Sequence, residues 1–417
     1  MDKDQLKRIV LDQKNYFKSR NNLIYRDINY ELYIRTSQIV VISGVRRCGK
    51  SCLLSLFRQK MELADSEFCY LNCDDERLML DELLLDELYS LHLELYGTEP
   101  VFFFDEVQMV PQWEKFVNRM YEYGHKIFVT GSNARLLSSE IATSLTGRNR
   151  VITLFPFSFK EYLRYKKHDY QIDALTTSAK SYLLADFNAF QRIGGFPLVV
   201  QEDDMEILNA WFQDILYRDV VSRYRMSQVK ELRRMAVYLF SNVGKLFSYS
   251  TLQKVSELKS LNSVSHYLQY LEQSYLFFYL PKFDYSLKKQ MLNPKKLYVI
   301  DAGAINRLGF HFSEGKGRLL ENTVYLELLR RGKEVYYHKG DKECDFVIVE
   351  NGKVVEALQV TDKITTQGKD REIGGLKDAM NTYQLENAKI IVYDREDSLA
   401  EGIDVPVVSA WEWLMTT

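Results

Sequence analysis

Short apolar runs alternate with amphipathic stretches through the first 160 residues of the chain. The runs of strand length are Ile39–Ser43, Phe68–Asn72, Val101–Phe104 and Lys126–Thr130. Between the last two runs, apolar side chains recur at helical spacing and a glycine follows at the expected helix end: Trp113, Phe116, Val117, Met120, Tyr121 and Gly124. Strands that alternate with helices predict βαβ units, and therefore an α/β fold whose parallel sheet is buried on both faces.

The pattern changes beyond residue 160. Residues 161–228 predict irregular helices, interrupted by a polar stretch at 168–180 and by the Gly-Gly-Phe-Pro of 194–197. Over 229–290 the pattern predicts three short helices followed by an aromatic strand pair. The helices are Met235–Asn242, Ser250–Val255 and Ser263–Gln273, and the extended segment begins with Tyr275–Leu280. This order is typical of a winged helix.

Residues 291–417 return to a mixture of strands and helices. The predicted strands are Leu297–Ile300, 335–338, 344–349, 354–361 and 389–393, and the predicted helices are Arg318–Arg331 and 370–383. The pattern therefore divides the chain into four parts, 1–160, 161–228, 229–290 and 291–417. A length of 417 residues agrees with more than one domain.

The overall composition is that of an ordinary globular protein. Apolar residues make up 46%, charged residues make up 27%, and the net charge is −2. These values exclude a disordered chain and a protein that coats nucleic acid by bulk charge. The first residues are charged, unlike a secretory signal, and the longest apolar runs fall well short of the ~20 residues that span a bilayer. We therefore expect a soluble, cytoplasmic protein with no membrane partner.

Charge is distributed unevenly along the first part of the chain. Residues 1–60 contain 13 lysines and arginines against 5 acids, whereas residues 61–115 contain 2 against 15. An anion-binding site followed by an acidic helical face would account for this difference. Two solvated surfaces of opposite charge would account for it equally well.

The five cysteines do not form a recognisable metal or disulfide pattern. Cys48 and Cys52, like Cys69 and Cys73, are separated by three residues, which is not the spacing of a zinc knuckle, and no histidine pair accompanies them. An odd number of cysteines is typical of a reducing compartment. We therefore interpret these residues as buried thiols in a cytoplasmic protein.

A phosphate-binding loop is predicted directly after the first strand. Gly44-Val45-Arg46-Arg47-Cys48-Gly49-Lys50-Ser51 fits the Walker A pattern G-x-x-x-x-G-K-[ST], and Cys52 follows it into the predicted helix. The glycines allow successive backbone N–H groups to face a phosphate, and the helix N-terminus adds partial positive charge. Lys50 would contact the β- and γ-phosphates, and Ser51 would bind Mg²⁺. Cys48 would have a lowered thiol pKa at a helix N-terminus, but we favour its role as a small filler of the loop.

Two acids follow the buried strand at 101–104. Asp105 stands where a Walker B carboxylate would bind Mg²⁺, and Glu106 is placed to orient or deprotonate an attacking water. Acids also end strands simply because the chain reaches solvent there. Beside a phosphate loop, the catalytic interpretation is the stronger one.

Further site candidates follow the next strand. Ser132 or Asn133 is a candidate sensor of the γ-phosphate, although an ordinary turn would use the same residues. Arg148, and with it Arg150, is a candidate arginine finger toward its own subunit or a neighbour in a homo-oligomer. A surface arginine is the alternative for both.

These residues together resemble a known family. The segments GVRRCGKSCLL, FFFDEVQMVPQWEKF, VTGSNARLL and SLTGRNRVITLFPFSFKEYL, followed by GGFP, are similar to bacterial and archaeal predicted AAA-type ATPases with a C-terminal domain of unknown function. The resemblance runs over nearly the whole chain. It implies an AAA+-like P-loop core (1–160), a helical lid (161–228), a winged-helix segment (229–290) and a terminal domain similar to the PD-(D/E)xK nuclease fold (291–417). It also implies ATP as the nucleotide.

In that nuclease fold, a helical acid, a strand aspartate and an E-x-K element bind a divalent metal. Glu321 matches the helical acid and Asp345 the strand aspartate, whereas Gln359 and Thr361 stand at the E-x-K positions. Both departures weaken a metal site, because glutamine is neutral and threonine carries no positive charge. Lys363 would lie on the same strand face as Gln359 and can replace the missing lysine. We favour a retained fold used for DNA or protein contact over active cleavage.

A winged helix would use Ser263–Gln273 as its recognition helix. Its predicted outward side chains are polar but carry little charge, and nearby lysines would contact phosphates: Lys254, Lys259, Lys282, Lys288 and Lys289. Such helices also contact proteins, so both partners stay open. We favour DNA contact on the analogy of fold.

The favoured function is that of an ATP-hydrolysing switch or motor in which Lys50, Ser51, Asp105 and Glu106 act on ATP and Mg²⁺. The first alternative is a nucleic-acid enzyme whose ATPase gates a Mg²⁺-dependent nuclease. The second is a partner-binding protein that senses nucleotide without hydrolysing it. Coupling to DNA and assembly into a homo-oligomer are further expectations.

Overall fold

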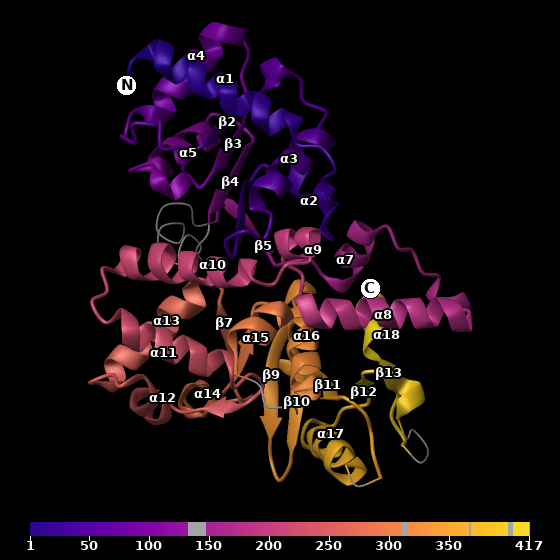
Figure 1. Ribbon diagram of the computed structural model, residues 1–417. Helices are drawn as coiled ribbons and strands as arrows, with labels where there is room; N and C mark the ends of the chain where they lie inside the picture. The colour runs from indigo at the N-terminus through magenta and orange to yellow at the C-terminus, as the bar shows by residue number, and fades with distance from the viewer. Residues whose placement is uncertain (132–146, 311–314, 367, 399–402, 417) are drawn as a thin grey trace. The chain divides into compact units, whose positions relative to one another are not determined.

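A parallel sheet organises the first of two compact units, Met1–Phe155 and Pro156–Thr417 (Figure 1). The computed structural model describes residues 1–131, 147–310, 315–366, 368–398 and 403–416. The sheet of the first unit has five strands in the order β2-β3-β4-β1-β5, and every pairing is parallel. Its strands are β1 (Ile39–Gly44), β2 (Phe68–Asn72), β3 (Val101–Asp105), β4 (Ile127–Gly131) and β5 (Asn149–Leu154).

Helices cover both faces of this sheet, which confirms the predicted α/β class. One face packs against α1 (Lys3–Ser19), α4 (Leu84–Tyr96) and α5 (Trp113–Glu122) through a continuous apolar cluster. The other face packs against α3 (Lys50–Lys60), where the rings of Phe57 and Phe128 lie 4.8 Å apart. The short helix α2 (Tyr30–Arg35) packs on α3. Two 3₁₀ turns, η1 (Asp65–Glu67) and η2 (Val107–Met109), complete the unit.

The parallel register brings the ends of four strands, β1 to β4, to one edge of the sheet. Asn72 pairs with Asp105, Phe104 with Val129, and Ser43 with Gly131. The residues that directly follow β1 and β3 therefore lie at the same edge, where parallel α/β sheets usually bind ligands.

The second unit begins with helices, as the sequence predicts. They are α7 (Phe159–Lys166), η4 (Ile172–Ala174), α8 (Thr177–Ile193), α9 (Pro197–Glu202), α10 (Ile207–Asp214) and a π-helical stretch, η5 (Ile215–Ser222). Apolar residues line the buried sides of these helices, with Trp211 among the largest fully buried side chains.

Three helices and a three-stranded antiparallel sheet follow. The helices are α11 (Val229–Phe240), α12 (Tyr249–Ser256) and α13 (Leu261–Gln273). The sheet has the order β6-β8-β7, built from β6 (Leu246–Phe247), β7 (Phe277–Leu280) and β8 (Lys295–Val299). The sequence pattern places β8 in the last block, but in the structure its partners precede it in the chain. A strand's partners depend on tertiary pairing, which its own apolar pattern does not specify.

The last part of the unit is a mixed five-stranded sheet in the order β13-β12-β11-β10-β9. Its strands are β9 (Glu334–Lys339), β10 (Glu343–Glu350), β11 (Lys353–Thr361), β12 (Ala388–Val392) and β13 (Val407–Ser409). The remaining helices are α14 (Leu287–Leu292), α15 (Ala302–Leu308), α16 (Lys316–Arg330), α17 (Lys369–Tyr383), η6 (Arg395–Asp397) and α18 (Ala410–Met415). Helices α16 and α17 both contact β11. In the described part of the chain, no helix is long and apolar enough to cross a membrane.

Candidate functional site

The segment between β1 and α3 forms a tight loop that requires glycine at two positions. A Cβ on Gly44 would lie 2.1 Å from the carbonyl oxygen of Leu154, so a larger residue would displace β5. Gly49 has a φ of 102°, in the left-handed region that other residues rarely adopt. The loop leads directly into α3, whose first backbone N–H groups have no partners within the helix. Such an arrangement can bind phosphate oxygens through the backbone.

Two arginines from the segment before β1 hold this loop in place, and sequence reasoning missed both. Arg20 donates from Nη1 to the carbonyl oxygen of Ser51 at 2.7 Å. Arg26 is buried and donates to the carbonyl oxygens of Cys48 at 3.0 Å and Phe155 at 2.6 Å. Part of the positive charge in residues 1–60 thus stabilises the loop backbone. The charge imbalance was the available signal, but it did not identify these two residues.

Lys50 lies within the loop and is only 5% exposed. Its Nζ donates to the carbonyl oxygens of Gly44 at 3.2 Å and Val45 at 3.3 Å. The same ammonium group lies 3.6 Å from Oε1 of Glu106. The structure therefore brings the predicted Walker A lysine to the residue that follows β3.

Asp105 ends β3 in a buried group of oxygen atoms. The hydroxyl of Thr130 donates to its Oδ1 at 2.5 Å, and the Tyr70 hydroxyl lies 3.4 Å from its Oδ2. Burial raises the pKa of Asp105, and the negative charge of Glu106 raises it further. The Ser51 hydroxyl lowers the pKa of Asp105, so it favours the ionised carboxylate. A hydroxyl and a carboxylate at one point suit a magnesium ion, which prefers oxygen ligands, so the residues present fit this metal.

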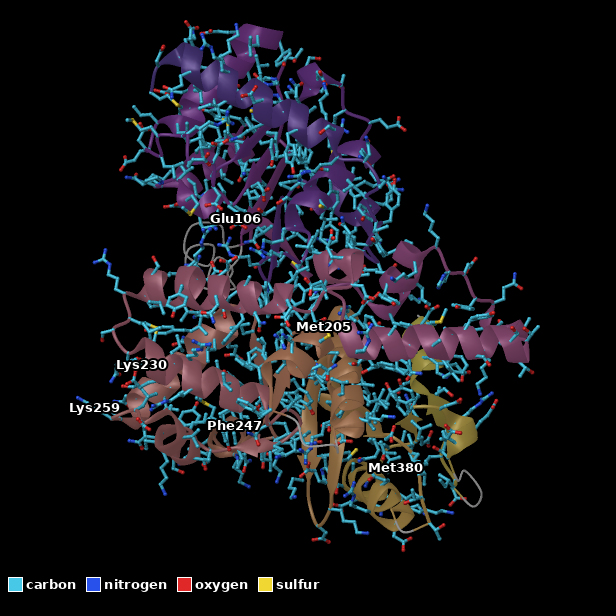
Figure 2. All side chains as sticks on the ribbon, viewed as in Figure 1. Glu106, Met205, Lys230, Phe247, Lys259 and Met380 are labelled. Atoms are coloured by element: carbon cyan, nitrogen blue, oxygen red, sulfur yellow. The ribbon has the colours of Figure 1, made fainter. Side chains whose placement is uncertain are left out.

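Glu106, labelled in Figure 2, directly follows β3. Its φ is 51°, a left-handed conformation that is uncommon for a residue with a side chain. Its N–H donates to the hydroxyl of Thr130 at 2.9 Å, and Gln108 donates to its Oε2 at 2.5 Å. The carboxylate is 18% exposed, so it is accessible to water while its position is restrained.

Thr130 is a site residue that the sequence did not identify. Its single hydroxyl donates to Asp105 and accepts from the backbone of Glu106, so it fixes both acids. The sequence analysis chose candidates just after β4, whereas Thr130 lies within that strand. Its polar side chain in an otherwise apolar strand was the signal available. Asn133, the predicted phosphate sensor, lies outside the described residues, as does Ser132.

The two cysteines of the loop differ in exposure. Cys48 is fully buried, and burial raises the pKa of its thiol. The expectation of a lowered pKa is therefore wrong, because desolvation outweighs the helix N-terminus and the nearby cations. Cys52 is exposed, which corrects its interpretation as a buried thiol, while Cys69 and Cys73 are buried as expected.

Arg148 lies at the opposite edge of the sheet from the phosphate loop. Its carbonyl oxygen accepts from the N–H of Ile39, the first residue of β1. Its guanidinium contacts Asn118 at 3.3 Å and Glu122 at 3.2 Å. Arg150 contacts Gln38 near the same edge. The structure does not bring either arginine to the loop of its own chain.

A second group of charged residues lies inside the C-terminal unit, around Lys296 of β8. Its Nζ is 2.8 Å from Asp345, 3.0 Å from Glu343 and 3.2 Å from Glu321, and the side chain is only 2% exposed. Burial by itself lowers the pKa of Lys296, but the three carboxylates outweigh it and raise that pKa well above its usual range. The Tyr298 hydroxyl donates to Glu321 at 2.6 Å. We call Lys296, Glu321, Glu343 and Asp345 the Lys296 cluster.

The predicted E-x-K positions extend this cluster only in part. Gln359 accepts from the N–H of Asp345 at 3.3 Å and donates to Glu372 at 2.8 Å. Thr361 ends β11, so Lys363 lies beyond the strand, exposed, and not on the strand face where it was expected. In the part of the chain that the structure describes, Lys363 makes no ion pair with the cluster.

The residues of the Lys296 cluster do not fit a divalent metal. The ammonium group of Lys296 occupies the position between Glu321 and Asp345 that a metal ion would need. A lysine ammonium and a metal cation cannot share this space, because both require the same carboxylate oxygens. Sequence reasoning missed Lys296, since it lies 25 residues before Glu321 on a strand of another sheet.

The predicted recognition helix α13 buries the apolar side chains that the sequence predicts for its inward face. Val264, Tyr267, Leu268 and Leu271 are buried. Its exposed side chains are mostly uncharged and include one acid, Glu272, and the predicted phosphate contacts Lys254, Lys259, Lys288 and Lys289 are exposed. Lys282 is half-buried in the segment after β7. The structure thus leaves the predicted DNA contact of this helix untested.

Comparison with known proteins identifies the class of the first unit. Residues 36–163 match an AAA domain, 184–314 match a domain of unknown function (DUF8612), and 316–413 match a second one (DUF4143). The first unit is therefore an AAA-type P-loop domain. The chain is 38% identical to the uncharacterized protein MJ1544 of Methanocaldococcus jannaschii, over 98% of this chain and 94% of that one. An uncharacterized protein of Haemophilus influenzae is 32% identical over 94% and 98%. The chain belongs to the family of these AAA-domain proteins.

Two solved structures match the chain at low sequence identity and low TM-score. The replication initiator DnaA, bound to AMPPCP and single-stranded DNA, is 16% identical, covers 58% of this chain and 84% of its own, and has a TM-score of 0.27. The RuvB Holliday junction branch migration motor of Thermotoga maritima is 14% identical, covers 67% and 88%, and has a TM-score of 0.30.

Proposed function

We propose that this protein binds and hydrolyses ATP in complex with Mg²⁺ at the phosphate loop of its first unit, as a molecular switch or motor. The observation that supports the proposal is the convergence of Lys50, Asp105 and Glu106 at one edge of a parallel sheet. These groups come from two separate strand ends and meet beside a glycine-dependent loop. A glycine turn that matched the Walker A pattern only by chance would have no reason to lie beside two acids from another strand.

The geometry suggests a separate role for each residue. Lys50 would exchange the carbonyl oxygens of Gly44 and Val45 for the β- and γ-phosphates, which are better acceptors for an ammonium group. Ser51 and Asp105 would hold the Mg²⁺ ion, which when bound neutralises charge on the phosphates. Glu106 would lose its contact with Lys50 and accept a proton from the attacking water, or orient it.

Phosphate release from ATP and Mg²⁺ by the purified full chain tests this proposal. Lys50→Ala should abolish ATP binding, because it removes the buried ammonium group that lies between the loop carbonyl oxygens and Glu106. Glu106→Gln should retain ATP binding, measured with a fluorescent ATP analogue, and stop phosphate release. Glu76→Gln is the matched control, since Glu76 is an exposed acid of the same unit. Turnover in Glu106→Gln equal to that of Glu76→Gln would refute the role of Glu106.

The arginine finger is proposed only in trans. Arg148 lies away from the loop of its own chain, so its predicted role requires a neighbouring subunit in a homo-oligomer. Specific activity should then rise with protein concentration, and Arg148→Ala should remove that rise without changing ATP binding. A specific activity independent of concentration, and unchanged by Arg148→Ala, would leave Arg148 as a surface residue.

We do not propose Mg²⁺-dependent DNA cleavage for the C-terminal unit, although the sequence raised it. The Lys296 cluster has an internal cation where cleavage would require a metal, so we propose that it stabilises the unit instead. Incubation of supercoiled and branched DNA with the protein and Mg²⁺ or Mn²⁺ should give no cleavage. Cleavage that disappears in Asp345→Ala would overturn this conclusion.

A further inference from the structure

A large cavity lies in the second unit between α11, α15 and the start of α16. It has a volume of about 1160 Å³, far more than a single phosphate ion needs. Six of the side chains that line it are cationic: Lys230, Arg233, Arg234, Lys245, Lys316 and Arg318. None of the described lining residues is acidic. We call these residues the basic cavity.

Most of these cations have no ion-pair partner among the residues that the structure describes. Arg234 forms an ion pair with Glu257, and Lys245 donates to Asn242 at 3.1 Å. For Lys230, Arg233, Lys316 and Arg318, the described part of the chain provides no ion-pair partner, and all four side chains are exposed. Because the whole chain has a net charge of −2, this positive charge is a local feature and not a result of composition. A concave surface lined by one sign of charge attracts polyanions.

The cations of α11 form one stripe along the helix. Lys230, Arg233 and Arg234 are followed at helical spacing by Val237, Tyr238 and Ser241, which also line the cavity. Lys230 and Lys259 are labelled in Figure 2, and only Lys230 belongs to the cavity. Lys316 and Arg318 belong to the start of α16, far away in sequence. The cations are spaced along α11, and others at the start of α16 line the same cavity. This arrangement suits an extended chain of phosphates better than a single anion.

Aromatic side chains also line the cavity. Phe310 is 74% exposed, and its N–H donates to the hydroxyl of Ser241 at 2.9 Å, so its backbone is anchored beside α11. Tyr238 contributes a second aromatic ring to the lining. Sites that combine cations for the backbone with aromatic faces for the bases are typical of single-stranded nucleic acid recognition.

We propose that the basic cavity binds a single strand of nucleic acid, with phosphates on the cations of α11 and α16 and a base against Phe310. The charge complementarity and the exposed ring support this occupant over an acidic protein segment, which would use the cations but would not require an exposed aromatic face. The proposal differs from the prediction that α13 and its lysines contact DNA. It does not depend on ATP hydrolysis.

Fluorescence anisotropy of a labelled 20-nucleotide single strand with the full chain, without nucleotide, tests the proposal. Arg233→Gln combined with Lys316→Gln should weaken binding about tenfold and reduce the slope of log K against log salt by about 1.4, or 0.7 for each phosphate contact. The control is Lys254→Gln combined with Lys259→Gln, which removes the same charge from exposed lysines outside the cavity. It should change the affinity less than about twofold.

Phe310→Ala provides a readout that charge alone does not affect. It should weaken binding of the single strand about fivefold and leave binding of a duplex unchanged, because paired bases cannot stack on the ring. Thermal denaturation of each variant shows whether the fold is retained. Equal losses in the cavity and control variants, or a loss only in the control, would overturn the proposal in favour of α13 or nonspecific charge. Binding of labelled polyglutamate, with no binding of the oligonucleotide, would identify an acidic protein as the occupant and would also overturn the proposal.

Discussion

Lys50 and Lys296 are both buried cations beside carboxylates, yet their surroundings differ in kind. Lys50 contacts two backbone carbonyl oxygens and one carboxylate at 3.6 Å, whereas Lys296 contacts three carboxylates within 3.2 Å. A cation held by weak acceptors can transfer to a stronger one, such as a phosphate. A cation that already contacts three carboxylates has no reason to transfer, since a phosphate would not be a stronger set of acceptors than those three carboxylates. The comparison teaches that the number and strength of existing partners separate a binding lysine from a structural one.

The largest difference should appear when the same substitution is made in both regions. Lys296→Met should lower the free energy of unfolding by about 3–5 kcal/mol, because three carboxylates lose the buried cation that they share. Lys50→Met should lower it by only about 1 kcal/mol, because the ammonium group gives up two hydrogen bonds to neutral carbonyl oxygens and one carboxylate contact at 3.6 Å. Chemical denaturation of the two variants measures both values. Equal losses would show that the comparison is wrong.

A double-mutant cycle sharpens the same point for the Lys296 cluster. Removing the negative charge as well, in Lys296→Met with Asp345→Asn, should recover part of the lost stability, with a coupling energy of about 1–3 kcal/mol. Asparagine keeps an oxygen that can accept from the N–H of Val360, which Asp345 holds at 3.0 Å. Denaturation midpoints of the wild type, both single variants and the double variant provide the cycle. Strict additivity would mean that the two side chains are not energetically coupled.

Thr130 offers a smaller effect in the phosphate-loop region, and this prediction rests on the proposed ATPase. Thr130→Val keeps the shape of the side chain but leaves Asp105 and the N–H of Glu106 without their shared hydroxyl. As a positioning residue, it should lower kcat about tenfold, or about 1.4 kcal/mol, with little change in KM. Thr130→Ser should restore most of the turnover, whereas a purely packing role would not be rescued by serine.

The smallest effect is expected at Lys363. Because it lies beyond the end of β11, Lys363→Met should change the free energy of unfolding by no more than about 0.5 kcal/mol. Chemical denaturation of Lys363→Met and Lys296→Met compares their losses of unfolding free energy. Lys363 is the lysine that the sequence predicts at this site, and Lys296 is the one that the structure places in the cluster. A loss above 2 kcal/mol would restore Lys363 as a member of this cluster.

Several features could be predicted from the chain alone because they depend on neighbouring residues. The strand at Phe68–Asn72 has the predicted bounds, and the strand at Val101–Asp105 extends one residue beyond them. The Walker A pattern of Gly44–Ser51 is likewise local, since a turn, a helix start and a lysine follow one another directly. Apolar periodicity and glycine placement are properties of short segments, so they can be recognised without knowing what packs against them.

Only the tertiary structure brought together the residues that are distant in sequence. Arg20 and Arg26 reach the loop from before β1, Thr130 joins the two acids, and Lys296 enters the carboxylate cluster from another sheet. The basic cavity likewise combines α11 with α16. Such partners depend on strand order and helix packing, which local patterns do not encode. The chain alone therefore located the phosphate loop, while the packing of distant segments decided which lysine is free to bind a ligand.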